Sequence, residues 1–177
     1  GFHKEIRHVK IAFYLDTLDK NSGCLRVIPG SHLIADDYSE SLERDLKESE
    51  DKWGVTGSEI PAVALEVEPG DIFAFRHNTK HAAFGGSGRR RMFTINCCEH
   101  VADDRIDMLK KDMEGLSRFL VERAYGEKMI RTAGPGRMRH LEQRLANDGL
   151  LAELSRQARK EMVEPSRGGG QYDKVRK

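Results

Sequence analysis

The sequence has few cysteines, no long apolar run and almost no net charge. Its 177 residues include three cysteines, Cys24, Cys97 and Cys98, and this odd, irregularly spaced set argues against a disulfide framework and a zinc knuckle. The 30 basic and 29 acidic residues leave a formal net charge of +1. The sequence therefore lacks the excess of basic residues that is typical of nucleic-acid-binding proteins. No apolar run approaches the roughly 20 residues of a membrane span, and the polar start GFHKEIRHVK does not have the pattern of a signal peptide. We therefore expect a cytoplasmic protein that binds neither nucleic acid nor a membrane.

Residues 1–100 carry short apolar runs punctuated by Pro-Gly turns, a pattern typical of a β-sandwich or barrel. A polar stretch at 36–53, with Leu42 and Leu46 at helical spacing, predicts a surface helix inserted between strands. The predicted strands cover residues 9–16, 24–30, 62–70, 71–75 and 91–98.

After His100 the apolar residues recur at the spacing of amphipathic helices. The pattern predicts one helix over 103–125, a second that begins at Pro135 and a third from Leu151 to Met162. The expected organisation is therefore a β core at 1–100, a helical extension at 101–165 and a flexible, glycine-rich tail at 166–177.

The segment HAAFGGSGRRRMF, residues 81–93, places a histidine before a glycine-rich turn and three arginines after it. If FGGSG closes a hairpin, His81 and Arg90 face each other across two strands, with Cβ atoms roughly 5 Å apart, and Arg91 points to the other face unless a bulge intervenes. A neutral imidazole binds transition metals, and a guanidinium binds a carboxylate through two parallel hydrogen bonds. The segment thus suits a metal that binds an organic acid, and a loop with solvated arginines and an incidental histidine is the alternative.

Three segments in this order, IAFYLDTLDKNSGCLRVIPGSH, VEPGDIFAFRHNTKH and GRRRMFTIN, resemble the C-terminal half of the phytanoyl-CoA dioxygenase family. The resemblance covers residues 9–98 and implies a mainly β chain with C-terminal helices, whose core is part of a double-stranded β-helix, the jelly-roll or cupin-like fold. It also implies an enzyme that uses Fe(II), 2-oxoglutarate and O2. Such an enzyme hydroxylates a small organic substrate while 2-oxoglutarate is decarboxylated to succinate.

The resemblance assigns roles to individual residues. His81, which follows GDIFAF, matches the distal iron-binding histidine of the family. Arg90 best matches the arginine that binds the distal carboxylate of 2-oxoglutarate, and Arg91 is the alternative. Tyr14 lies on a strand that lines the cofactor pocket in relatives, but the sequence leaves open whether Tyr14 or Phe13 points inward.

The sequence departs from the family at the rest of the iron site, which in relatives includes a His-x-Asp motif. No His-x-Asp occurs in this sequence. His3 and Glu5 form a His-x-Glu, which some oxygenases of the broader superfamily use as ligands, but the segment from Glu5 to Val9 is short for the usual loop, so an incidental pair is the alternative. We expect that the chain lacks the N-terminal portion that carries the motif.

This departure leaves a second function open. The chain could be a catalytically incomplete or degenerate jelly-roll protein with a binding or assembly role, for example as a homodimer. Exposed sheet edges and an incompletely covered core would favour self-association of such a chain.

Overall fold

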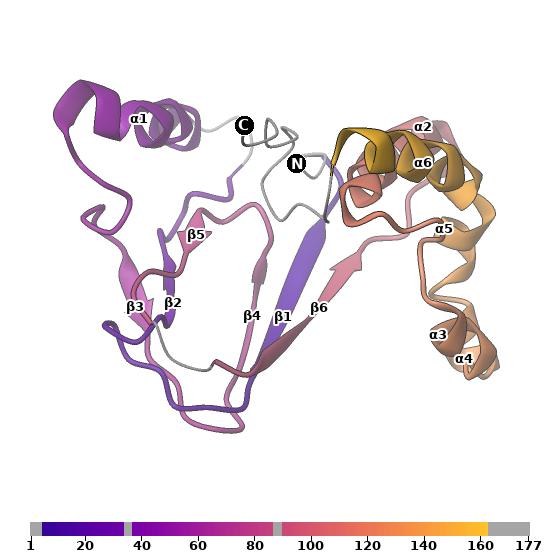
Figure 1. Ribbon diagram of the computed structural model, residues 1–177, viewed down its shortest axis with the longest axis horizontal. Helices are drawn as coiled ribbons and strands as arrows, with labels where there is room; N and C mark the ends of the chain where they lie inside the picture. Colours follow the sequence, from indigo (N-terminus) through magenta and orange to yellow (C-terminus); the bar gives the residue numbers. More distant parts are fainter. Residues whose placement is uncertain (1–4, 34–36, 87–89, 163–177) are drawn as a thin grey trace. The chain divides into compact units, whose positions relative to one another are not determined.

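The computed structural model describes residues 5–33, 37–86 and 90–162. The chain divides into two compact units, one formed by Arg7–Cys98 and the other by Gly1–Ile6 together with Glu99–Lys177. The first unit holds two small antiparallel sheets and one helix, and the second holds short helices (Figure 1). The tail predicted at 166–177 lies outside the described residues.

The first sheet has the order β4-β1-β6, with β1 (His8–Tyr14) between β4 (Ile72–Arg76) and β6 (Met92–Cys98) (Figure 1). Both pairings are antiparallel, and Ile11 of β1 lies opposite Ala74 and Ile95. Ala12 and Tyr14 are buried on one face of β1, as the two-residue period of a strand requires. The strands predicted over 9–16, 71–75 and 91–98 are confirmed.

The second sheet has the order β3-β2-β5, with β2 (Leu25–Val27) between β3 (Val63–Leu65) and β5 (His81–Ala82). The strands predicted over 24–30 and 62–70 are thus present but shorter. A cluster of buried side chains, drawn from β1 and from the segments that flank β2 and β3, forms the core of this unit: Ala12, Tyr14, Leu18, Cys24 and Val67.

The predicted hairpin between His81 and Arg90 is wrong. β5 pairs with β2, where His81 lies opposite Val27, whereas β6 pairs with β1. Gly85 and Gly86, which follow β5, pack against a distant turn: Gly85 has φ +79°, and a Cβ on it would lie 2.4 Å from the backbone oxygen of Asn21. The strands on either side of the glycine-rich segment therefore belong to different sheets and do not form a hairpin.

Helix α1 (Asp37–Trp53) confirms the helix predicted between strands. Two contacts hold it to the second sheet's flanking segments. The Ser39 hydroxyl donates to the Ser31 carbonyl oxygen at 2.9 Å, and Lys80 Nζ, adjacent to β5, lies 3.0 Å from Glu43 Oε2. Helix α1 is therefore attached beside the strand that carries His81.

The helical unit differs from the prediction of one long helix over 103–125. The chain there forms η1 (Asp103–Arg105), α2 (Ile106–Glu114) and η2 (Gly115–Phe119), and it ends at Leu120 with φ 57°. Gly115 has a weak helix propensity, and the Ser117 hydroxyl bonds the Glu114 carbonyl oxygen at 2.7 Å. Such side-chain bonds offer the backbone an alternative to a regular helix.

The remaining helices are short. Helix α3 (Glu127–Arg131) was not predicted, and α4 (Pro135–Met138) begins at Pro135 as expected but ends after one turn. Helix α5 (Glu142–Ala146), η3 (Asp148–Leu150) and α6 (Leu151–Glu161) follow, and α6 confirms the third predicted helix. The buried apolar side chains of this unit include Leu109, Met113, Leu141, Leu151 and Ala158. The expectation of a mainly β chain thus holds for the first unit only, and within the described residues no helix has the length and apolarity to cross a bilayer.

Candidate functional site

His81 occupies a fixed, half-buried position on β5. Its Nδ1 lies 2.7 Å from the backbone oxygen of Thr79, and its Nε2 lies 3.4 Å from Lys10 Nζ on β1. A carbonyl oxygen can only accept a hydrogen bond and an ammonium can only donate one. Nδ1 therefore carries the proton, and Nε2 carries the lone pair. This is the tautomer of an imidazole that can bind a metal through Nε2.

Burial lowers the pKa of His81, and the positive charge of Lys10 lowers it further, against the opposing hydrogen bond to Thr79. The imidazole is therefore neutral at pH 7, as a metal ligand must be. Aromatic rings confine it as well. The Phe75 ring meets it edge-on with centroids 5.1 Å apart, and the His77 ring is tilted toward it at 5.8 Å.

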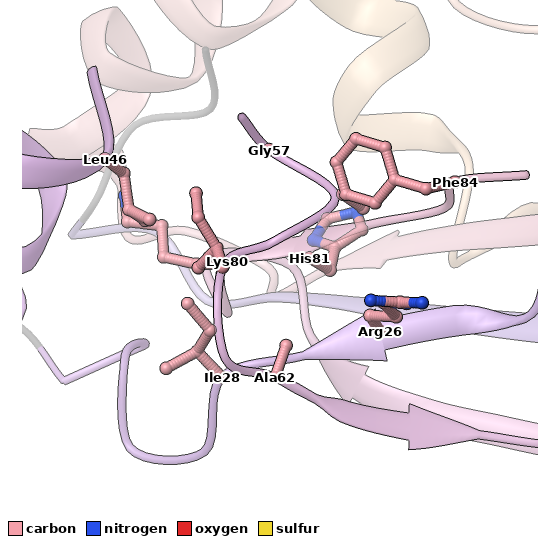
Figure 2. A pocket seen from close by; sticks show the side chains of 10 residues that line it. Arg26, Ile28, Leu46, Gly57, Ala62, Lys80, His81 and Phe84 are labelled. Carbon is pink, nitrogen blue, oxygen red and sulfur yellow. The ribbon is translucent and has the colours of Figure 1, made fainter. Parts of the chain in front are cut away.

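His81 also borders a pocket of about 240 Å³ (Figure 2). The pocket is bounded by β2, α1, the segment 57–62 and the segment 80–84. Its basic lining residues are Arg26, Lys80 and His81. The rest of the lining is apolar or glycine: Ile28, Leu46, Gly57, Ile60, Ala62, Ala82 and Phe84.

Arg90 and Tyr14 come together at a second place in the same unit. Arg90 donates from its Nη1 to the Gly23 carbonyl oxygen at 2.8 Å. Tyr14 is 2% exposed, and burial raises the pKa of its hydroxyl while the Arg90 charge opposes that rise. Tyr14 therefore points into the core of the unit, whereas Phe13 stacks on Phe93 on the other face of the sheet, with centroids 4.5 Å apart. This answers which of the two side chains points inward.

Arg91 is engaged elsewhere. Its Nη2 lies 2.6 Å from Asp16 Oδ1, its Nε lies 3.0 Å from the same oxygen, and its backbone N–H donates to Asp16 Oδ2. The pair with Asp16 raises the pKa of Arg91. An arginine held in this way is a poorer anchor for a soluble carboxylate than Arg90, whose only hydrogen bond among the described residues is to Gly23.

The places of the other two predicted iron ligands relative to His81 stay a prediction. His3 lies outside the described residues. Glu5 is exposed, its backbone oxygen accepts a hydrogen bond from Arg105 Nη1 at 3.5 Å, and it belongs to the other unit. Within the described residues no group of three or more His, Cys, Asp or Glu side chains could hold a metal ion. His81 thus fits the role of one iron ligand, but the described residues do not complete a metal centre.

The comparisons with known proteins point to one family. The sequence model of the phytanoyl-CoA dioxygenase family (PhyH) matches residues 2–93, more than half of the chain. The chain belongs to the phytanoyl-CoA dioxygenase family. The family suggests activity of the iron- and 2-oxoglutarate-dependent oxygenase type.

Among solved structures, the chain is similar to the protein in the crystal structure of EvdMO1, with 28% identity over 54% of this chain and a TM-score of 0.39. The match covers 20% of that protein, so this chain spans about a fifth of its length. The comparison with curated proteins found no match.

Two functional candidates escaped the sequence reasoning, Lys10 and Arg26. Both lie on strands that the apolar pattern identified, but the pattern gave no reason to place either near His81. Arg26 reaches the pocket because β2 is the neighbour of β5, with Arg26 opposite Ala82. Had that strand pairing been known, the alternation along β2 would have pointed to Arg26.

Proposed function

We propose that this chain forms part of an Fe(II)- and 2-oxoglutarate-dependent dioxygenase that hydroxylates a small organic substrate and converts 2-oxoglutarate to succinate. The observation that carries the proposal is His81, in a chain of this family. Its neutral imidazole is fixed by the Thr79 carbonyl and presents Nε2 for coordination. When bound, iron and 2-oxoglutarate supply the activation of O2.

In this proposal the residues of this chain bind and orient the iron and 2-oxoglutarate. His81 contributes one iron ligand, and the Thr79 carbonyl holds its ring and its tautomer. Arg90 anchors the distal carboxylate of 2-oxoglutarate, Arg91 being held by Asp16, and Tyr14 forms part of the wall beneath Arg90. The remaining ligands come from residues outside those described, His3 among the candidates.

The wider organisation fits this proposal. The two three-stranded sheets are part of a double-stranded β-helix, with the β core at 1–100 and the helical extension at 101–165. Cys24, Cys97 and Cys98 take part in no disulfide among the described residues, which supports a reducing, cytoplasmic location. Helix α1 supplies Leu46 to the pocket beside His81 and acts as part of a substrate lid.

The test is an anaerobic titration of the purified chain with Fe(II) and 2-oxoglutarate, read by the visible charge-transfer band of the chelate. The wild-type chain should develop the band, and His81→Ala should lose it. His100→Ala, which removes an exposed histidine of the other unit, is the matched control and should keep the band. A wild-type chain without any band would show that this chain does not hold the metal site.

A second candidate function, assembly with another copy of the chain, is favoured by one observation. The outer face of the first sheet is apolar and exposed, with Ile72 55%, Phe93 50% and Ile95 46% accessible. Monomeric soluble proteins rarely expose such contiguous apolar residues. Sedimentation velocity tests the idea: a dimer that Phe93→Lys dissociates supports it, and a stable monomer across the accessible concentration range refutes it.

A further inference from the structure

The pocket beside His81 is an apolar site with one unbalanced positive charge. Its walls are formed mainly by Ile28, Leu46, Ile60 and Phe84, and none of its lining residues is acidic. Its volume of about 240 Å³ lies just below the roughly 300–1,000 Å³ typical of drug-sized ligand pockets. The space therefore suits a compact ligand with a short apolar body.

The charge belongs to Arg26. Its Nη1 donates to the Ser58 carbonyl oxygen and its Nη2 to the Lys20 carbonyl oxygen, both at 3.1 Å. These two bonds fix the guanidinium, which Figure 2 shows rising from β2 toward Phe84 and His81. Its Nε is buried and has no hydrogen-bond partner among the described residues. That atom has almost no accessible surface, so a ligand would meet the guanidinium at its Nη atoms, each of which has a second N–H beyond the bond described.

The other two basic residues of the pocket do not add to this charge. Lys80 is paired with Glu43 at 3.0 Å. His81 has its Nδ1 against the Thr79 carbonyl oxygen and its Nε2 against the Lys10 ammonium, one donor and one acceptor, which is the pattern of an uncharged ring. Arg26 takes part in no ion pair that the structure describes, and both of its paired partners are neutral carbonyl groups. The pocket thus offers one cation, the Arg26 guanidinium, with an N–H left on each of its Nη atoms.

We infer that this pocket binds a small apolar monocarboxylate, with its chain against Ile28, Leu46 and Phe84 and its carboxylate at Arg26. Carboxylates form charge-assisted hydrogen bonds with guanidinium groups, roughly twice as strong as neutral ones, and a monocarboxylate leaves an apolar chain for the apolar walls. The identification of this ligand as the substrate of the oxygenase rests on the proposed function, whereas the binding itself does not.

The pocket also contains a glycine, Gly57, at which a substitution tests the shape of the pocket apart from its charge. A Cβ on Gly57 would lie 2.8 Å from Cζ of Phe84. Gly57 therefore lets the Phe84 ring take its place in the wall, and Gly57→Ala must displace that ring. Gly136→Ala, where a Cβ meets nothing within 4 Å, is the matched control.

The experiment compares two probes of equal length, hexanoate and hexanamide, added to the isotopically labelled full chain without iron and followed by amide chemical shifts. We expect both to perturb amides at 26–28, 57–62 and 80–84, with hexanoate bound roughly tenfold more tightly. Arg26→Gln should abolish that preference, and Arg26→Lys, which keeps the charge, should retain part of it. Arg44→Gln, which removes an exposed charge of α1 outside the pocket, should leave the preference intact.

Each other outcome overturns part of the inference. Equal affinity for the two probes would refute the role of the Arg26 charge, and shifts elsewhere, or none, would refute the pocket. Gly57→Ala should weaken both probes alike, and unchanged binding of both would contradict the apolar site. If 2-oxoglutarate alone displaced hexanoate with the same dependence on Arg26, the pocket would belong to the cosubstrate and not to a substrate. Because no iron is present, failure of the iron titration leaves these results unaffected.

Discussion

His81 Nε2 lies 3.4 Å from the ammonium nitrogen of Lys10, so the lone pair that would bind a metal faces a cation. Burial lowers the pKa of Lys10. The hydrogen-bond partners described for Lys10 and His81 include no carboxylate. A metal at Nε2 therefore requires Lys10 to move aside or a carboxylate ligand to offset its charge. An acidic iron ligand, which the described residues do not place beside His81, would supply the negative charge that balances Lys10.

The stability of the chain should depend on pH through His81. Its pKa is lowered in the folded chain, mainly by burial and further by Lys10, whereas the unfolded chain keeps a value near 6.5. As the pH falls through that value, the unfolded state therefore binds more protons than the folded state does. The folded state then loses stability as the pH falls further. We expect Tm to fall more steeply from about pH 7.5 to about pH 5.5 in the wild-type chain than in His81→Gln.

Lys10→Met provides the second arm of that measurement. It removes the charge beside His81 but leaves the larger effect of burial, so the acid slope should lie between those of the wild type and His81→Gln. Parallel Tm profiles for all three chains would show that His81 titrates normally and that its burial has no thermodynamic consequence.

The two adjacent arginines should behave differently toward 2-oxoglutarate. Arg91 is bound to Asp16 through its backbone and its side chain, whereas Arg90 makes one described side-chain bond, to the Gly23 carbonyl. We expect Arg90→Gln to weaken 2-oxoglutarate binding at least roughly tenfold, the scale of a charge-assisted bond, and Arg91→Gln to change it little. Isothermal titration with 2-oxoglutarate and Fe(II) under anaerobic conditions measures both, and the reverse ranking would make Arg91 the anchor.

The strands and helix α1 were predictable because alternation and helical spacing are local properties of the sequence. The partner of each strand was not. The turn FGGSG looked like the end of a hairpin, yet Gly85 serves a contact with Asn21, far away in the chain. Arg26 was missed for the same reason, because its place in the pocket depends on the pairing of β2 with β5, which the sequence did not predict. The family resemblance thus pointed to His81, but only the strand order identified its neighbours.

Gly85 should tolerate no side chain. Its φ of +79° is strained for any residue with a Cβ, which itself costs about 1–2 kcal/mol, and that Cβ would clash with the Asn21 backbone oxygen at 2.4 Å. We expect Gly85→Ala to lower the free energy of unfolding by at least about 2 kcal/mol, measured by urea denaturation. Gly136→Ala, with open space around it, should change it by less than about 0.5 kcal/mol, and equal effects would contradict the close approach.

Helix α1 should be held in place by Lys80. Both Lys80 and Lys47 contact Glu43, at 3.0 Å and 3.2 Å, but Lys47 belongs to the same helix and Lys80 does not. We expect Lys80→Met to accelerate amide hydrogen exchange along residues 37–53, because it removes a contact that joins the helix to β5. Lys47→Met removes only a contact within the helix and is the matched control. Equal acceleration in the two variants would show that the Lys80 contact does not anchor the helix.

The helical unit contains a buried ion pair, and we expect the loss of one partner to cost more stability than the loss of both. Asp112 on α2 is fully buried, and its Oδ2 lies 3.8 Å from Nη2 of Arg144 on α5, which is 13% exposed. Removing one partner of a buried pair takes away part of the compensation of the other charge, which can cost about 3–5 kcal/mol, whereas replacing both with apolar residues is often nearly neutral. We expect Arg144→Met to destabilise the chain by about 3 kcal/mol, and Asp112→Leu combined with Arg144→Met to restore much of that loss. Lys110→Met breaks the exposed pair with Asp107 and should cost less than about 1 kcal/mol. If Arg144→Met cost no more than Lys110→Met in the same urea series, the buried carboxylate of Asp112 would depend on its other contacts, and α2 and α5 would not be joined through this pair.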